Sequence, residues 1–140
     1  MNTANETWRE LGEIVEGTSP KILERIVDAT GEKVLKASLS SVKRRIWDIT
    51  DGLDEATEIG SEATLTINSI WFDTYQTDAG WTGSLGGYNC AHVVPASSLA
   101  GGGVGVKKRY QIEVRAYQSD GSSFWVTRAR ITVTDALGIS

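Results

Sequence analysis

The residues best suited to chemistry gather in one stretch, residues 72–95, which reads FDTYQTDAGWTGSLGGYNCAHVVP. It contains the chain's only cysteine, Cys90, and its only histidine, His92, together with Asp73 and Asp78. Because Cys90 and His92 are two residues apart, their side chains point to the same face if this segment is a β-strand. A thiolate–imidazole pair oriented by an aspartate is one chemistry that this set offers. A metal site formed by His92, Asp73 and Asp78 is another.

A structural role explains more of these residues. Neighbours on one strand face seldom give a nucleophile and its base the approach geometry that catalysis needs. Aspartate and threonine are typical of loops in which side chains satisfy backbone donors, and the glycines that follow permit a positive φ. We therefore predict no catalytic residue, cofactor-binding residue or metal ligand, but a structural corner formed by Asp73, Thr77, Asp78, Trp81 and Tyr88.

The elements that must position this corner alternate apolar and polar side chains, as β-strands do. Residues 110–117 and 124–133 show this pattern on either side of an Asp-Gly turn at 120–121, which predicts a hairpin. Residues 63–76 alternate as well, with a change of phase that predicts a bulge near 68–69.

Residues 19–52 fit two interpretations. A Ser-Pro start and a later glycine suit the ends of a helix. Alternatively, residues 22–27 and 42–49 are strands, with a turn at 28–31, and the strongly β character of the other segments favours this reading. The glycine-rich segment 99–108 is predicted to be a loop outside the core. Short strands separated by turns predict a mainly β protein with an immunoglobulin-like antiparallel β-sandwich.

The first 17 residues are predicted to form an N-terminal arm, separate from a sandwich domain at 18–140. Their apolar residues recur at roughly helical spacing, which predicts a short amphipathic helix or an extended arm. A helix of this length is not stable alone. We expect it to clamp a neighbouring subunit, the alternative being that it folds back onto its own domain. The predicted contact residues are Trp8, Leu11, Ile14 and Val15.

The composition of the chain limits the classes of function that it can have. The chain has 140 residues, 40% of them hydrophobic, which suits one globular domain with a core. Its net charge is −4 with both signs interspersed, which argues against a nucleic-acid surface. One cysteine excludes an internal disulfide and a cysteine-based structural zinc site. Without an apolar run long enough for a signal or a membrane span, we expect a soluble protein made in the cytoplasm.

The stretch FDTYQTDAGWTGSLGGYN, with VEGTSPKILERIVDATGEKVLKASLSSVKRRIWDITDG before it and RYQIEVRAYQSDGSSFWV after it, resembles small β-rich proteins encoded among structural genes of tailed phages and prophages. The shared pattern is D-T-x-Q-T-D-x-x-W-T at 73–82, G-Y-N at 87–89 and a Y-x-V/I-E strand at 110–113. The resemblance covers about residues 13–134. It departs at Cys90, where an aromatic residue is expected, and in the glycine-heavy loop described above.

The resemblance implies an immunoglobulin-like sandwich that serves as a virion building block, with no enzymatic activity and no cofactor. We expect a multi-copy ring or adaptor component of the neck or tail, located in the virion after synthesis in the host bacterial cytoplasm. Its expected partners are copies of itself and other neck, tail or capsid proteins, without nucleic acid or membrane. One alternative is a capsid decoration or cement protein. An alternative from another class is a small carbohydrate-binding module, in which Tyr75, Trp81 and Tyr117 stack on sugar rings.

Overall fold

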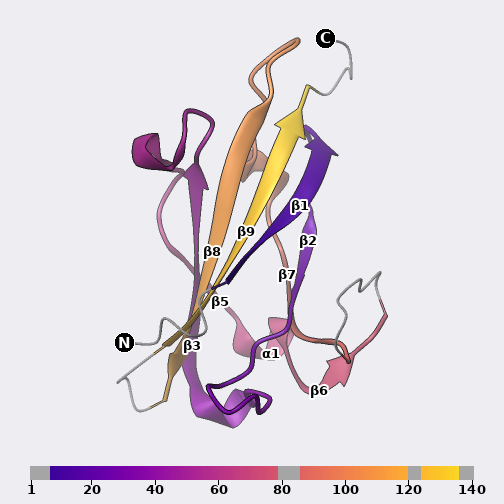
Figure 1. Cartoon of the computed structure of the whole chain (residues 1–140), viewed down its shortest axis with the longest axis vertical. Helices are drawn as coiled ribbons and strands as arrows, with labels where there is room; N and C mark the ends of the chain where they lie inside the picture. Colours follow the sequence, from indigo (N-terminus) through magenta and orange to yellow (C-terminus); the bar gives the residue numbers. More distant parts are fainter. Residues whose placement is uncertain (1–6, 79–85, 120–123, 136–140) are drawn as a thin grey trace.

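The computed structural model describes residues 7–78, 86–119 and 124–135, and two β-sheets pack there face to face (Figure 1). The larger sheet has the order β1-β9-β8-β3-β4, with β5 also paired to β3, and the smaller has the order β2-β7-β6. The strands are β1 Thr7–Val15, β2 Lys21–Glu24, β3 Leu39–Asp48, β4 Thr57–Glu58, β5 Ala63–Leu65, β6 Trp71–Gln76, β7 Tyr88–Val93, β8 Lys108–Gln118 and β9 Phe124–Thr134. Helical turns are α1 Ile67–Ile70, η2 Lys36–Ser38, η3 Leu53–Glu55 and η4 Ala96–Ser98.

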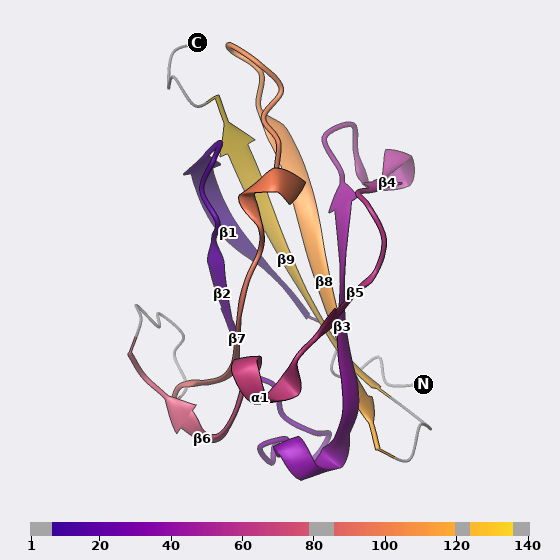
Figure 2. The same cartoon turned by 180° about the vertical axis from the view of Figure 1, so that it is seen from behind.

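This arrangement confirms the predicted sandwich and is consistent with an immunoglobulin-like fold. Such a fold packs two mainly antiparallel sheets face to face over a core of inward-facing side chains. Here β8 and β9 form the antiparallel hairpin, β3 pairs with β8, and β1 runs parallel to β9 at the edge. Figure 2, which shows the molecule from behind, has β2 and β7 in front of that hairpin. The predicted Asp-Gly turn at 120–121 lies outside the described residues.

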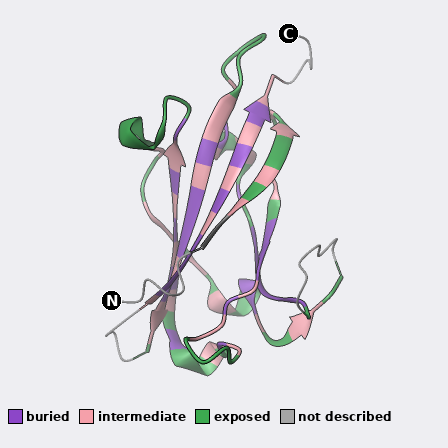
Figure 3. Ribbon diagram, in the orientation of Figure 1, coloured by how far each residue is buried: buried purple, intermediate pink, exposed green. Residues whose placement is uncertain are grey.

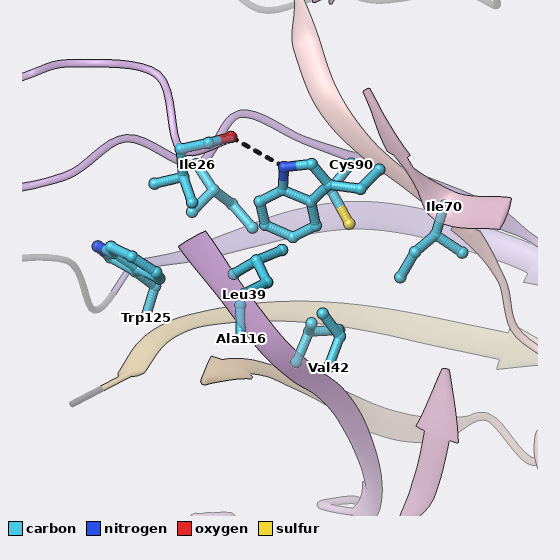
Figure 4. Packing of buried hydrophobic residues seen from close by; sticks show 10 residues of the cluster. Ile26, Leu39, Val42, Ile70, Cys90, Ala116 and Trp125 are labelled. Carbon is cyan, nitrogen blue, oxygen red and sulfur yellow. Dashed lines mark hydrogen bonds between the residues drawn. The ribbon is translucent and has the colours of Figure 1, made fainter. Parts of the chain in front are cut away.

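Alternation of side chains explains why these segments are strands. In β8, every second residue from Tyr110 to Ala116 is buried, whereas Gln111 and Arg115 between them are partly exposed. Figure 3 shows the resulting bands of buried and half-buried residues along β8 and β9. Two clusters fill the space between the sheets, one around Trp71, Val42, Val114 and Trp125 and the other around Ile22, Ile46, Ile112 and Ile131. Figure 4 shows Trp125, Val42 and Cys90 of the first cluster.

The strand interpretation of residues 19–52 is confirmed. β3 begins three residues before the predicted 42–49 strand and ends one residue before it does. β2 is shorter than the predicted 22–27 strand. The turn at 28–31 forms as expected, since the Gly31 amide donates to the Asp28 carbonyl at 3.0 Å and Val27 bridges to Lys33.

The predicted N-terminal helix is wrong, because this segment is the strand β1. Leu11 and Ile14 are three residues apart, yet both pack against the second core cluster. A β-bulge between Glu10 and Glu13 makes this possible, with Gly12 at a φ of +87°. The bulge adds one residue to the period of two, so two inward-facing positions acquire the spacing of a helix.

Residues 7–15 therefore form an edge strand of the larger sheet. In the single chain, the apolar residues of this segment pack onto their own domain, which is the alternative stated above. Of the four predicted contact residues, Leu11 and Ile14 are partly buried and Val15 is 46% exposed. The side chain of Trp8 lies outside the described part of the chain.

The prediction of one bulged strand over residues 63–76 is also wrong. The phase change marks a crossing between the sheets: β5 pairs with β3 in the larger sheet, and β6 pairs with β7 in the smaller one. The single helical turn α1 carries the chain across, and Ile70 at its end is buried in the first core cluster.

The glycine-rich segment 99–108 is a loop for most of its length, but its first residue contradicts the prediction that it lies outside the core. Leu99 is only 1% exposed and packs in the second cluster. Two hydrogen bonds hold the beginning of the loop, because the Gly101 amide donates to Glu16 at 2.8 Å and the Tyr110 hydroxyl donates to the Ala100 carbonyl at 2.7 Å.

Candidate functional site

The structure brings three of the five predicted corner residues into hydrogen bonds near β6 and β7. Asp73 Oδ1 accepts from the Lys36 amide at 2.7 Å, which ties β6 to the turn η2. Asp78 Oδ1 accepts from the Tyr88 hydroxyl at 2.5 Å, and this hydrogen bond raises the pKa of the phenol. Thr77 is exposed. Trp81 lies outside the described residues.

Gly87 is the residue of this corner whose backbone comes very close to the backbone of β6. Its φ is +122°, in the region that favours glycine, and its backbone lies against β6. A Cβ atom built there would overlap the Gln76 carbonyl oxygen and would lie 3.1 Å from the Tyr75 Cβ. The following residue, Tyr88, pairs with Gln76, so the contact sits inside the β6–β7 pairing.

We therefore expect Gly87→Ala to destabilise the domain by about 2 kcal/mol or more, because the backbone conformation and the carbonyl contact are both unfavourable for a side chain. Chemical denaturation with urea measures this difference. Gly60→Ala is the matched control, since it also has a positive φ, +68°, but no atom within 4 Å of the added methyl group. Equal losses for the two variants would contradict the close-approach role.

Asn89 is the main corner residue that sequence reasoning missed. It is fully buried, and its Oδ1 accepts from the Ile26 amide at 2.8 Å. Its Nδ2 donates to the carbonyls of Ile26 at 2.8 Å and Val34 at 3.4 Å. β2 ends at Glu24, so this amide side chain replaces the strand partner that the backbone at Ile26 lacks. The G-Y-N pattern was the available signal.

Trp71 is a buried tryptophan of this region that sequence reasoning missed. It is 1% exposed in the first core cluster, and its Nε1 donates to the Val34 carbonyl at 2.9 Å. The apolar residues next to Trp71 in the sequence were a possible signal of its burial. They do not by themselves distinguish a buried tryptophan from an exposed one.

The aromatic side chains proposed to stack on sugars have protein partners where they are described. The Arg25 guanidinium lies 3.8 Å from the centre of the Tyr75 ring, and Lys33 lies 5.3 Å from it. Tyr117 packs against Phe124 with ring centres 5.4 Å apart. These contacts are typical of rings that fasten strands and loops.

The candidate catalytic pair Cys90–His92 faces the interior of the sandwich. The register pairs Cys90 with Glu24 and His92 with Ile22, which confirms that the two side chains share a face. Burial raises the pKa of the Cys90 thiol far above its ordinary value, so the thiolate is disfavoured. Burial, reinforced by Arg44, lowers the pKa of His92 to about 4.

Several polar side chains lie around this pair, and sequence reasoning missed them. Glu24 is 4% exposed, and burial raises its pKa to about 7 although Arg9 and Thr127 oppose the shift. Arg9 of β1 reaches it across the sandwich edge, with Nη1 at 3.9 Å from Oε2, and also donates to the Leu23 carbonyl at 2.6 Å. Arg44 donates to the Val93 carbonyl at 3.0 Å. Neither ring nitrogen of His92 has a hydrogen-bond partner among the described residues.

The alternative metal site is not assembled. His92 is buried between the sheets, whereas Asp73 and Asp78 are exposed and bonded to a backbone amide and a phenol. Among the described residues, no three His, Cys, Asp or Glu side chains gather as metal ligands. In the same part of the chain, no helix has the length and apolar character needed to cross a bilayer.

Comparisons with protein-family models, with curated proteins and with solved structures find no match to this chain.

Proposed function

We propose that this chain is a non-enzymatic virion structural protein of a tailed bacteriophage. In this proposal it is present in several copies as a ring or adaptor component of the neck or tail. It acts through protein–protein contacts, with copies of itself and with other virion proteins, and uses no cofactor.

The observation that carries the proposal is that residues of the pattern that resembles phage structural proteins stabilise the scaffold of the sandwich. Asp73 and Asp78 hold η2 and Tyr88, Gly87 permits close packing, and Asn89 replaces a missing strand partner. Side chains that form hydrogen bonds with nearby backbone groups and with one another stabilise the local backbone conformation. This supports a building block rather than a site that turns over a substrate.

The interior polar group supports the same proposal. A buried thiol with a raised pKa is a weak nucleophile, and a histidine with a pKa of about 4 is largely neutral and is a weak base at neutral pH. Both side chains are closed off from solvent, Cys90 at 0% and His92 at 2% exposure. The covered rings of Tyr75 and Tyr117 likewise favour an assembly role over sugar binding.

Quantitative mass spectrometry of purified virions, with heads and tails separated, tests this function. We expect the protein at a fixed multi-copy ratio in the neck or tail fraction. Its recovery in the head fraction alone would favour the decoration-protein alternative instead. Absence from virions, together with glycan binding by the isolated protein, would overturn the proposal in favour of the carbohydrate-binding module.

A further inference from the structure

β1 is the first strand of the chain, and it covers the edge of the larger sheet without entering the core. From residue 9 to residue 15 no side chain is buried, whereas β3, β8 and β9 each place several buried side chains between the sheets. Leu11 and Ile14 pack only on the margin of the second core cluster. Among the described side chains, the buried members of both clusters come from other elements. Residues 9–15 can therefore leave β9 without removing a buried core side chain.

The edge that β1 covers is matched to this strand by charge. Glu24 of β2 lies buried there, and a buried carboxylate needs either a cation or a proton. Arg9 of β1 provides the cation, with Nη1 at 3.9 Å from Oε2 of Glu24, and it also donates to the Leu23 carbonyl at 2.6 Å. Farther along the strand, Lys107 pairs with Glu13 at 3.0 Å. Any strand that replaces β1 has to bring the same charges at the same spacing, and the β1 of a second copy does so.

A short turn joins β1 to β2 in the opposite sheet. Only residues 16–20 separate the two strands. The Thr18 amide donates to the Val15 carbonyl at 3.1 Å, and Gly17 has a φ of +93°, so the chain reverses sharply here. If the turn straightens, β1 extends past the end of its own sandwich by up to about 30 Å, the length of a strand of nine residues. Short connections of this kind favour exchange of strands between copies.

Exposed valines surround this turn. Val15 directly precedes it, Val93 pairs with Lys21 directly after it, and the loop 99–108 is held against it by the hydrogen bond to Glu16. Figure 1 shows the end of β1 and this loop at the same end of the sandwich. Of the six exposed large apolar side chains among the described residues, four lie around the turn: Val15, Val93, Val104 and Val106. This end of the molecule therefore offers apolar surface to a neighbour.

We propose that β1 is exchanged between copies, so that β1 of one copy pairs with β9 of the next. The straightened turn places the two copies end to end, and the valines around it form the new contact between them. Each copy gives a strand at one place and receives a strand at another, so the contact is heterologous. Repetition closes into a ring when the rotation between copies permits. This inference rests on the multi-copy assembly proposed above.

Concentration decides between the closed chain and the exchanged form. The pairing of β1 with β9 is the same whether the two strands belong to one copy or to two. Dilution favours the closed chain, because its two strands are already linked. Burial of the valines favours exchange. We therefore expect single chains in dilute solution and exchanged chains at the high local concentration of a growing particle.

Disulfide formation between two single-cysteine variants tests the exchange. Glu13→Cys on β1 and Thr132→Cys on β9 lie opposite each other in the register, and the native Cys90 is 0% exposed and does not compete. The variants are mixed at millimolar concentration and then oxidised with copper phenanthroline, one of them carrying a size tag. We expect a disulfide that joins the two variants. Lys43→Cys mixed with Arg115→Cys is the control, opposed in the same way between β3 and β8, and is expected to give none.

Substitutions at the turn make the test specific. Gly17→Ala is expected to raise the yield of joined chains by about tenfold, because a side chain at this φ is unfavourable in the closed turn and not in an extended one. Gly31→Ala, with a φ of +85° and equally open space around the added methyl group, is expected to leave the yield unchanged. Val104→Asp is expected to lower the yield by about fivefold. Leu35→Asp, at an exposed leucine next to η2, is its control.

No joined chains at millimolar concentration would overturn strand exchange. Equal yields from the Lys43–Arg115 control pair, or no rise with Gly17→Ala, would overturn it as well. These outcomes are separable from the proposed function, which depends on recovery of the protein in virions. Virions that contain the protein while the two variants stay unjoined reject only the exchange of β1.

Discussion

Replacing Asn89 with leucine is expected to destabilise the domain by about 2–4 kcal/mol. It leaves the buried Ile26 amide without a partner, which costs about 1–3 kcal/mol, and it removes the shorter of two hydrogen bonds to the Ile26 carbonyl, worth about 1 kcal/mol. Domains of this kind are stable by about 5–15 kcal/mol in total, so the variant is expected to lose a large share of its stability. The two side chains have the same branching and the same number of non-hydrogen atoms. The loss therefore reports the missing hydrogen bonds together with the added bulk of the methyl groups.

Urea denaturation followed by tryptophan fluorescence measures the effect. Asn89→Asp is the informative second variant, because it keeps the acceptor for the Ile26 amide but removes the donor to the Ile26 carbonyl. It also buries a charge, so its stability should improve on acidification. Asn68→Leu, at an exposed asparagine in α1, is the matched control and is expected to change stability little. A loss below 1 kcal/mol for Asn89→Leu would contradict the role assigned to Asn89.

The second large effect is a pair of opposing pH dependences inside the sandwich. Burial raises the pKa of Glu24 from 4.5 to about 7, so between these values the folded chain holds one more proton there than the unfolded chain. Stability from Glu24 is therefore full below pH 4.5 and is lost as the pH rises through 7. The pKa of His92 falls from 6.5 to about 4, so its contribution is full above 6.5 and is lost as the pH falls through 4.

The two contributions are expected to cancel over the range they share, about pH 4.5 to 6.5. Glu24→Gln removes one of them. The free energy of unfolding should then rise by on the order of 3 kcal/mol between pH 4 and 6.5, from His92 alone. His92→Gln should give the opposite slope, a fall of similar size between pH 4.5 and 7, from Glu24 alone.

Urea denaturation at a series of pH values gives these slopes. The pKa values of Glu10, Asp28 and Asp48 are lowered, so these carboxylates affect stability in acid and do so equally in all three proteins. The comparison between variants therefore isolates the interior pair. Parallel pH profiles for wild type, Glu24→Gln and His92→Gln would show that neither side chain has the assigned protonation in the folded chain.

The strands of the larger sheet could be predicted because their signal is local. Apolar and polar residues alternate along 110–117 and again along 127–133, and Tyr110, Ile112 and Val114 on one face of the hairpin are buried. A period of two needs only neighbouring residues to be recognised. The same holds for β3, where Val42 and Ile46 face the core. In β3 the pattern also placed Arg44 on the core side, which only its carbonyl partner at Val93 makes tolerable.

The positions at which this period of two is interrupted could be interpreted only from the tertiary structure. The bulge at Gly12 gave Leu11 and Ile14 a helical spacing, and pairing with β9 is what makes the segment a strand. In residues 63–76 the change of phase was visible, but a bulge and a crossing between sheets produce the same change. The choice depends on which distant strand each half meets, β3 or β7.

The sequence by itself determined the mainly β sandwich, the hairpin, and the structural character of Asp73, Asp78 and Tyr88, because residue type and short-range spacing suffice for each. Only the tertiary structure decided which side chains complete one another. Asn89 serves Ile26, 63 positions away, and Glu24 meets Arg9 across the edge of the sandwich. Such pairs follow from the packing of the two sheets, and no local pattern specifies the partner that a buried polar group will find.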